Sequence, residues 1–145
     1  MVSSKVDFSF NKIRRIDGID QLAEMLFPNN CQHQRLFHAI FVDLKWSPDG
    51  FLPSLSSVAS NVNVSNRVLE TVRAKMRRLG VIDHVSKFNS KYGYQEGWIL
   101  SRRFERSLVN LATSVARLSE TTDPRTEERD KLMLSLSGVE KARLD

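Results

Sequence analysis

Residues 65–79 read SNRVLETVRAKMRRL and are followed by Gly80. Four apolar residues recur at spacings of four, four and three, which places them on one side of an α-helix: Val68, Val72, Met76 and Leu79. Ser65 is a favourable N-cap, because its hydroxyl can accept from the free amides of the first turn. Gly80 can adopt the left-handed conformation that ends a helix. The stretch therefore predicts a helix with one side built to pack.

The other side of this helix is polar and basic. The helix carries five basic residues and one carboxylate: Arg67, Arg73, Lys75, Arg77, Arg78 and Glu70. Residues 65–91 hold seven basic side chains against two acidic ones, an excess that equals the whole net charge of +5. The positive field therefore belongs to this helix and the segment after it, and the sequence pI of about 9.7 favours a polyanionic partner.

The residues before this helix predict a shorter helix and a tight turn. In LSSVASNVNVS, residues 55–65, four residues share one face: Leu55, Val58, Ala59 and Val62. Asn63 tolerates the positive φ of a tight turn. Two helices joined in this way, with the second longer and basic, predict a helix-turn-helix.

Strand signals follow the basic helix. VIDHVSKF (81–88) and YQEGWILS (94–101) can pair across the loop at residues 89–93, which contains Asn, Ser and Gly. Residues 51–53 can supply a small third strand. A hairpin after the helix-turn-helix is the expected result.

This order of elements resembles the winged helix-turn-helix, and in particular MarR-type and related dimeric regulators, over roughly residues 32–118 by the pattern of segments. The Asp-x-Arg element frequent in MarR-type wings is not found between Val81 and Ser101. The resemblance implies a mainly α fold with a small β-hairpin wing, flanked by N- and C-terminal dimerisation helices. The expected organisation is an N-terminal arm and short helix (1–30), a DNA-binding domain (31–101), and C-terminal helices for dimerisation (102–145).

The basic helix suits the major groove of DNA, which is about 12 Å wide and admits one α-helix. Residues near the start of such a helix usually reach base edges, here Ser65, Asn66, Arg67, Glu70 and Thr71. The residues further along would meet phosphates: Arg73, Lys75, Arg77 and Arg78. The wing would add Lys87, Lys91 and Tyr92. Glu70 repels phosphate, which argues against purely nonspecific binding, and the alternative for the whole face is a solvated, salt-bridged helix surface.

The chain before the helix-turn-helix contains an arm and two helices. Val6, Phe8 and Phe10 alternate with polar residues as in a strand, and basic residues follow at 12, 14 and 15. This arm either packs its aromatic residues on the body of a subunit or touches DNA backbone. Residues 19–27 predict a short helix, and residues 32–46 a helix with a broad apolar face that packs behind the helix-turn-helix.

The C-terminal helices carry the expected dimer interface. From residue 101 to 118 the apolar residues are spaced four, three, four and three, a narrow seam typical of paired helices: Phe104, Leu108, Leu111, Val115 and Leu118. A last helix would begin at Asp123-Pro124 and end at Gly138. Its leucines could instead cover the seam within one chain and leave a monomer.

Enzyme chemistry is not expected, because convergent titratable groups are not found. His38 lies in the apolar run FHAIF, which favours a core or interface histidine over a ligand or a base. Cys31 and His33 lack a second pair at metal spacing, so we expect no metal and no cofactor. One cysteine and no apolar run of about 20 residues favour a cytoplasmic, nucleoid-associated protein rather than a membrane protein.

The sequence thus predicts a homodimeric, sequence-specific transcription regulator that binds double-stranded DNA. A small-molecule effector is possible in this class, and nothing in the residues supports one. Two alternatives use the same fold: a winged-helix module that binds acidic protein partners, and a replication or partition protein of a mobile element. The salt dependence of binding distinguishes DNA binding from the first alternative, because DNA affinity falls steeply as counterion release is lost.

Overall fold

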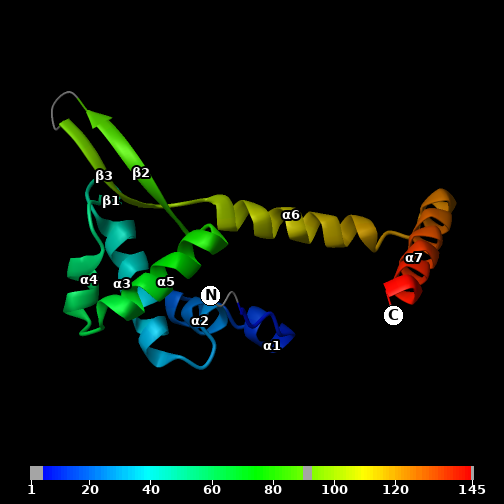
Figure 1. The fold of residues 1–145 in the computed structure, drawn as a ribbon, viewed down its shortest axis with the longest axis horizontal. Helices are drawn as coiled ribbons and strands as arrows, with labels where there is room; N and C mark the ends of the chain where they lie inside the picture. The colour runs from blue at the N-terminus through cyan, green and yellow to red at the C-terminus, as the bar shows by residue number, and fades with distance from the viewer. Residues whose placement is uncertain (1–4, 90–92, 145) are drawn as a thin grey trace. The chain divides into compact units, whose positions relative to one another are not determined.

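The computed structural model describes residues 5–89 and 93–144, and this part of the chain is mainly helical with a small three-stranded antiparallel sheet (Figure 1). Its elements, in order, are α1 (Phe10–Ile13), α2 (Ile19–Leu26), α3 (Cys31–Trp46), β1 (Phe51–Leu52), α4 (Ser56–Asn61), α5 (Asn66–Leu79), β2 (Ile82–Asn89), β3 (Gly93–Leu100), α6 (Arg103–Leu118) and α7 (Pro124–Leu144). The chain divides into two compact units, residues 1–106 and 107–145. Each unit is described by itself.

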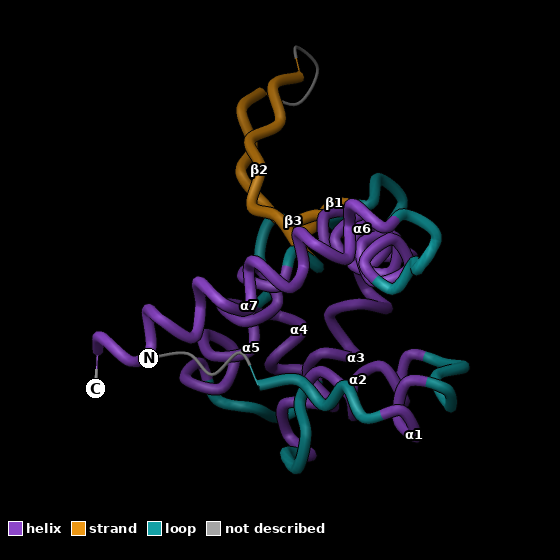
Figure 2. The backbone as a smooth tube through the Cα atoms, turned by 90° about the vertical axis from the view of Figure 1, so that its right-hand side faces the viewer, coloured by secondary structure: helices purple, strands orange, loops and turns teal. Residues whose placement is uncertain are grey.

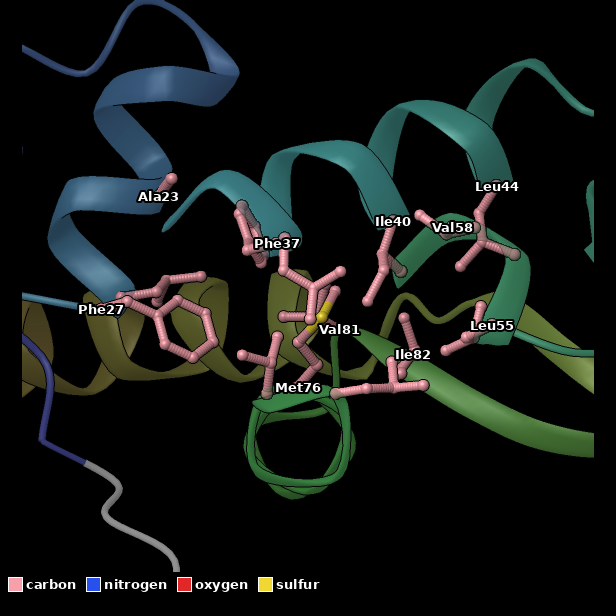
Figure 3. Packing of buried hydrophobic residues seen from close by; sticks show 14 of the residues in the cluster. Ala23, Phe27, Phe37, Ile40, Leu44, Leu55, Val58, Met76, Val81 and Ile82 are labelled. Atoms are coloured by element: carbon pink, nitrogen blue, oxygen red, sulfur yellow. The ribbon is translucent and has the colours of Figure 1, made fainter. Parts of the chain in front are cut away.

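Helix α3 is the centre of the first unit, where it packs against α2, α4, α5 and β3. It begins at Asn30, whose side-chain oxygen accepts from the amide of His33 at 3.1 Å. Its broad apolar face is buried except for Phe41, which is half-buried, and meets side chains of the neighbouring elements in one continuous core (Figure 3). The buried residues of α3 are Leu36, Phe37, Ile40 and Leu44.

The sheet has the strand order β1-β3-β2, and the two long strands pair from Ile82 opposite Leu100 to Asn89 opposite Gly93. The hairpin projects beyond the helices of its unit (Figure 2). The third strand expected at residues 51–53 is present as β1, which pairs antiparallel with β3, Phe51 opposite Ile99 and Leu52 opposite Trp98. A Cβ at Gly97 would lie 2.4 Å from the ring of Phe51, so only glycine permits this approach.

Gly80 ends α5 and contacts the start of α6. Its φ of 87° is left-handed, which ends α5 as the sequence predicts. Its carbonyl accepts from the amide of Phe104 at 2.9 Å, so the start of α6 rests on the end of α5. A Cβ here would lie 3.0 Å from the Cβ of Arg103, so both conformation and space favour glycine.

The strand-like alternation of Val6, Phe8 and Phe10 is not accompanied by a strand within residues 5–13. These residues form an irregular segment and the short helix α1, with Phe8 and Phe10 exposed. The segment is nevertheless attached to the body, because Val6 packs on the core and the amide of Asp7 donates to the carbonyl of Met25 at 2.9 Å. Helix α2 contributes Ala23, Met25 and Leu26 to the same core, so packing is continuous across the boundary expected at residue 30.

The second unit contains residues 107–118 of α6 and the whole of α7. Helix α7 begins where expected, with the carboxylate of Asp123 accepting from the amide of Arg125 at 2.9 Å. Its expected end at Gly138 is wrong, because the helix continues to Leu144. Glycine weakens a helix by about 1 kcal/mol but leaves its backbone hydrogen bonds possible. None of the described helices is long and apolar enough to cross a membrane.

Candidate nucleic-acid interface

The start of α5 is fixed by a turn and a cap. Asn63 has a φ of 56°, as the tight turn between α4 and α5 requires. The guanidinium of Arg35 on α3 donates to the carbonyl of Val62 at 2.7 Å and so ties this turn to the core helix. The hydroxyl of Ser65 accepts from the amide of Val68 at 3.2 Å, which confirms the predicted N-cap.

The inner side of α5 holds the helix on the core. Val72 and Met76 are buried as predicted, whereas Leu69, which the predicted stripe omits, is also buried. Val68 and Leu79 are only partly buried at the edges of this side. The apolar side is therefore rotated slightly from the expected one, and it leaves the opposite side of the helix uncovered in the chain.

The uncovered side of α5 is basic, apart from one carboxylate. Five of its residues are exposed: Asn66, Arg67, Glu70, Arg77 and Arg78. Two more, Thr71 and Arg73, are half-buried. The predicted base-reading residues therefore lie together at the first two turns. Thr71 differs from the others, because its hydroxyl already donates to the carbonyl of Arg67 at 3.0 Å. Ser65 is exposed as well, although its oxygen is engaged in the cap.

Lys75 does not belong to this surface, which corrects the predicted phosphate contact. Its side chain is buried at 5% exposure, and its ammonium donates to the carbonyl of Lys5 at 2.7 Å. The same ammonium lies 4.5 Å from the ring centre of Phe27. Burial lowers the pKa of Lys75 from its ordinary value. Lys75 therefore fastens the N-terminal segment to α5.

His33 lies close to Lys75 and is half-buried. Its ring packs edge-on against Phe27, with ring centres 5.9 Å apart. Burial, and then the positive charge of Lys75, lower the pKa of His33. The other two histidines are exposed, so His38 does not lie in the core, and its alternative position at an interface stays a prediction. The apolar residues beside His38 in sequence lie on other sides of α3.

The C-terminal half of α5 faces the base of the hairpin across an open hollow of about 760 Å³. Arginine and carboxylate side chains surround a single tryptophan there: Glu70, Arg73, Arg77, Arg78, Asp83, Trp98 and Arg103. The guanidinium of Arg73 lies 5.4 Å from the ring centre of Trp98. His84 packs edge-on against the same ring at 4.8 Å. The hollow therefore combines positive charge with a fixed aromatic surface.

Arg103 is a residue that the sequence interpretation missed. It forms an ion pair with Asp83, and it also donates to the backbone carbonyls of Arg77 at 3.3 Å and Ile82 at 3.5 Å. The hydrogen bond from Arg103 lowers the pKa of Asp83. The interaction joins the end of α5 and the beginning of β2 to the first turn of α6. Residues this far apart in sequence give no spacing signal for such a contact.

The tip of the hairpin carries the remaining predicted contacts. The β2 and β3 backbones pair up to Asn89 and Gly93, one residue further on each strand than the expected loop at residues 89–93 allows. Lys91 and Tyr92 lie outside the described residues, as does the side chain of Lys87. Their predicted roles stay predictions.

The seam of α6 is progressively uncovered along the helix. Phe104 is half-buried against the core of the first unit, and Leu108 is half-buried in the second. Leu111, Val115 and Leu118 are 53%, 53% and 65% exposed. The apolar residues of α7 are equally open, at 58–74% for Leu132, Met133, Leu134 and Leu136. Within the chain, α7 does not bury the exposed end of the seam.

Comparison with known proteins found no match among protein-family models, curated proteins or solved structures. The interface is therefore interpreted from its own residues. Among the residues that the structure describes, no three His, Cys, Asp or Glu side chains gather as a metal site would require.

Proposed function

We propose that this protein is a sequence-specific regulator of transcription that binds double-stranded DNA as a homodimer through a winged helix-turn-helix. The observation that carries the proposal is the divided surface of α5. Its inner side is anchored in the core, and its uncovered side presents arginines, an asparagine and one carboxylate. A rigid helix with this surface suits a major groove about 12 Å wide.

The roles of the exposed residues follow from their position along α5. Arg67 can donate two hydrogen bonds to guanine, Asn66 can pair with adenine, and Glu70 can accept from the amino group of cytosine. A carboxylate on a surface that approaches phosphates costs affinity on any sequence, so its presence supports specific readout. Arg77 and Arg78 lie two to three turns further on, where the DNA backbone passes.

The fold-level part of the proposal rests on the order of the elements. Helix α3, the short strand β1, helices α4 and α5, and the β2–β3 hairpin follow one another as in a winged helix. In this arrangement the hairpin is the wing and lies along the neighbouring backbone or minor groove. Lys87, Lys91 and Tyr92 are its proposed contacts.

The homodimer is proposed from the exposed seam of α6. A stripe of large apolar side chains at 53–65% exposure is costly to leave in water. A second copy offers the same stripe, and two-fold dimers are the commonest soluble oligomers. Two recognition helices would then read half-sites about one turn of DNA apart.

Selection of bound duplexes from a random pool tests the proposal. The expected product is one shared motif with two-fold symmetry and half-sites about 10 base pairs apart. A recovered pool without any common motif would contradict specific readout. A single unrepeated half-site would contradict the dimer but not the recognition helix.

A further inference from the structure

The hollow between the C-terminal half of α5 and the base of the hairpin is lined by side chains suited to bind an anion. Four arginines and two carboxylates line it. One arginine and one carboxylate, Arg103 and Asp83, satisfy each other as an ion pair. Because that pair lowers the pKa of Asp83, the carboxyl group stays ionised and bound to Arg103. The remaining lining is positive, with Glu70 as its only other carboxylate.

Arg73 is held in place within this hollow. Its guanidinium lies over the indole of Trp98, with 5.4 Å between the guanidinium carbon and the ring centre. Trp98 is itself fixed, because it is 8% exposed, sits in β3 and contacts the ring of His84. An aromatic ring attracts a nearby guanidinium without using its N–H donors, which stay available for an acceptor. Trp98 therefore pre-organises Arg73 for an anion with two adjacent oxygens.

The position of the hollow along α5 indicates the source of that anion. Asn66, Glu70, Arg73 and Arg77 are spaced four, three and four residues apart, so they form one row along the helix. With a rise of about 1.5 Å per residue, Arg73 and Arg77 lie roughly 9–15 Å beyond Arg67. A helix whose first turn reaches base edges would therefore bring these arginines to the rim of a groove about 12 Å wide. The backbone phosphates run along that rim.

We propose that the hollow holds one backbone phosphate of the bound nucleic acid, with Arg73 and Arg77 as its ligands and Trp98 as the residue that positions Arg73. This inference rests on the proposed DNA binding and adds the site that fixes the register of α5 on the duplex. Phosphate contacts of this kind orient a protein without reading sequence.

Trp98 also provides the optical probe. The chain has two tryptophans, and Trp46 is 73% exposed, so Trp46→Phe leaves Trp98 as the only tryptophan at little cost to the fold. Emission of Trp46→Phe is measured during titration with a mixed-sequence duplex and, separately, with inorganic phosphate at constant ionic strength. Both titrations should change the emission. Arg73→Gln in the same background should abolish both changes.

Salt dependence of duplex binding measures the contact itself. Arg73→Gln should lower the slope of log affinity against log salt by about 0.9, the value for one phosphate. Arg129→Gln removes the same charge from α7 and should leave the slope unchanged. Trp98→Phe should weaken binding about two- to fivefold, and should add little in the Arg73→Gln background. Thermal melting of Trp98→Phe confirms that the variant is folded at the temperature used.

The outcomes separate this inference from the proposed function. DNA binding with an unchanged slope and an unchanged Trp98 response in Arg73→Gln would overturn the phosphate site and leave the regulator proposal standing. Failure of the unmodified chain to bind any duplex, together with an Arg73-dependent response to inorganic phosphate, would overturn DNA binding and support an anion site. Failure of the unmodified chain to bind any duplex, with no emission response to inorganic phosphate, would overturn both.

Discussion

Helices α3 and α6 have the same length, 16 residues, and opposite surroundings. Helix α3 buries Leu36, Phe37, Ile40 and Leu44 against four neighbouring elements. In α6 no residue is fully buried, and the apolar side chains from Leu111 onward are more than half exposed. Both helices carry an apolar stripe, but only the stripe of α3 is buried within the chain.

The two apolar surfaces differ in width and therefore in the contacts that they suit. The broad face of α3 organises a core, and the narrow stripe of α6 suits contact with one further helix. Helix α5 combines both situations, because one side is covered by the core and the other carries exposed charge. The exposed apolar stripe of α6 and the exposed basic surface of α5 are the two surfaces with proposed partners, a second copy and DNA.

The largest expected effect comes from a matched pair of substitutions. Leu36→Ala in α3 removes a side chain at 0% exposure and should lower the free energy of unfolding by about 2–5 kcal/mol. Leu118→Ala in α6 removes one at 65% exposure and should cost about 0.5 kcal/mol or less in dilute protein. Denaturant unfolding of both variants measures the difference. A Leu118→Ala cost that grows with protein concentration would support the dimer, and equal costs in dilute protein would contradict the comparison.

Disruption of the α6 seam is expected to separate association from folding. Leu108→Glu combined with Leu111→Glu places two charges in the proposed dimer interface. The double variant should remain folded, sediment as a monomer, and bind its selected site about 10²-fold more weakly, because the second half-site no longer contributes. Sedimentation of the unmodified protein is the control. A mass near 16.6 kDa for that protein at micromolar concentration would rule out the dimer.

Substitutions on the exposed side of α5 should have a smaller and more selective effect. Asn66→Ala and Arg67→Ala should each cost about 1–3 kcal/mol of binding on the selected site, because bidentate contacts to bases are lost. The loss on scrambled duplex should be much smaller. Arg129→Gln, which also removes one positive charge, serves as the control for the arginine. Equal losses on both duplexes would show that these residues touch only the backbone.

The smallest expected effect is a pH dependence that reports burial at the start of α3. The pKa of His33 is lowered mainly by burial, so the unfolded chain takes up a proton at higher pH than the folded one. The free energy of unfolding should therefore fall as pH drops below about 6.5. His33→Gln should lose this dependence. Urea unfolding between pH 5 and 8 is the measurement, and an identical pH profile in His33→Gln would contradict the assigned environment.

An exposed pair on α6 gives the matching control for that prediction. The pKa of Glu105 is lowered by hydrogen bonds from Arg102, at 3.3 Å on the surface. High salt screens surface pairs strongly, because the Debye length falls to about 3 Å at 1 M. The Glu105 shift should fade in 1 M salt, and the shift of His33, which is mainly desolvation, should largely persist. Nuclear magnetic resonance titration of both groups at low and high salt distinguishes the two causes.

Local signals predicted much of the first unit. The Ser65 cap, the left-handed residues Asn63 and Gly80, the small strand at residues 51–52 and the β2–β3 hairpin all depend on short stretches of sequence. Each follows from the conformational preference of a few neighbouring residues. Gly138 is the exception, because a single glycine weakens a helix without stopping it.

What sequence could not provide is contact between distant segments. Lys75 sits among arginines in sequence, yet Lys5 and Phe27 cover it, and no periodicity within α5 places those residues there. The pairing of Arg103 with Asp83 likewise depends on how α6 starts on Gly80. The sequence therefore predicts a basic surface on α5. Which of its cations are buried and which are exposed follows only from the fold.

The affinity of the unmodified protein for its selected duplex, relative to a scrambled duplex of the same length and at the same salt concentration, tests the central claim most directly. A sequence-specific regulator should prefer the selected duplex by about 10³-fold or more at physiological salt. Equal affinity for the two duplexes, falling together as salt is raised, would show that α5 attracts DNA by charge alone and would contradict the account.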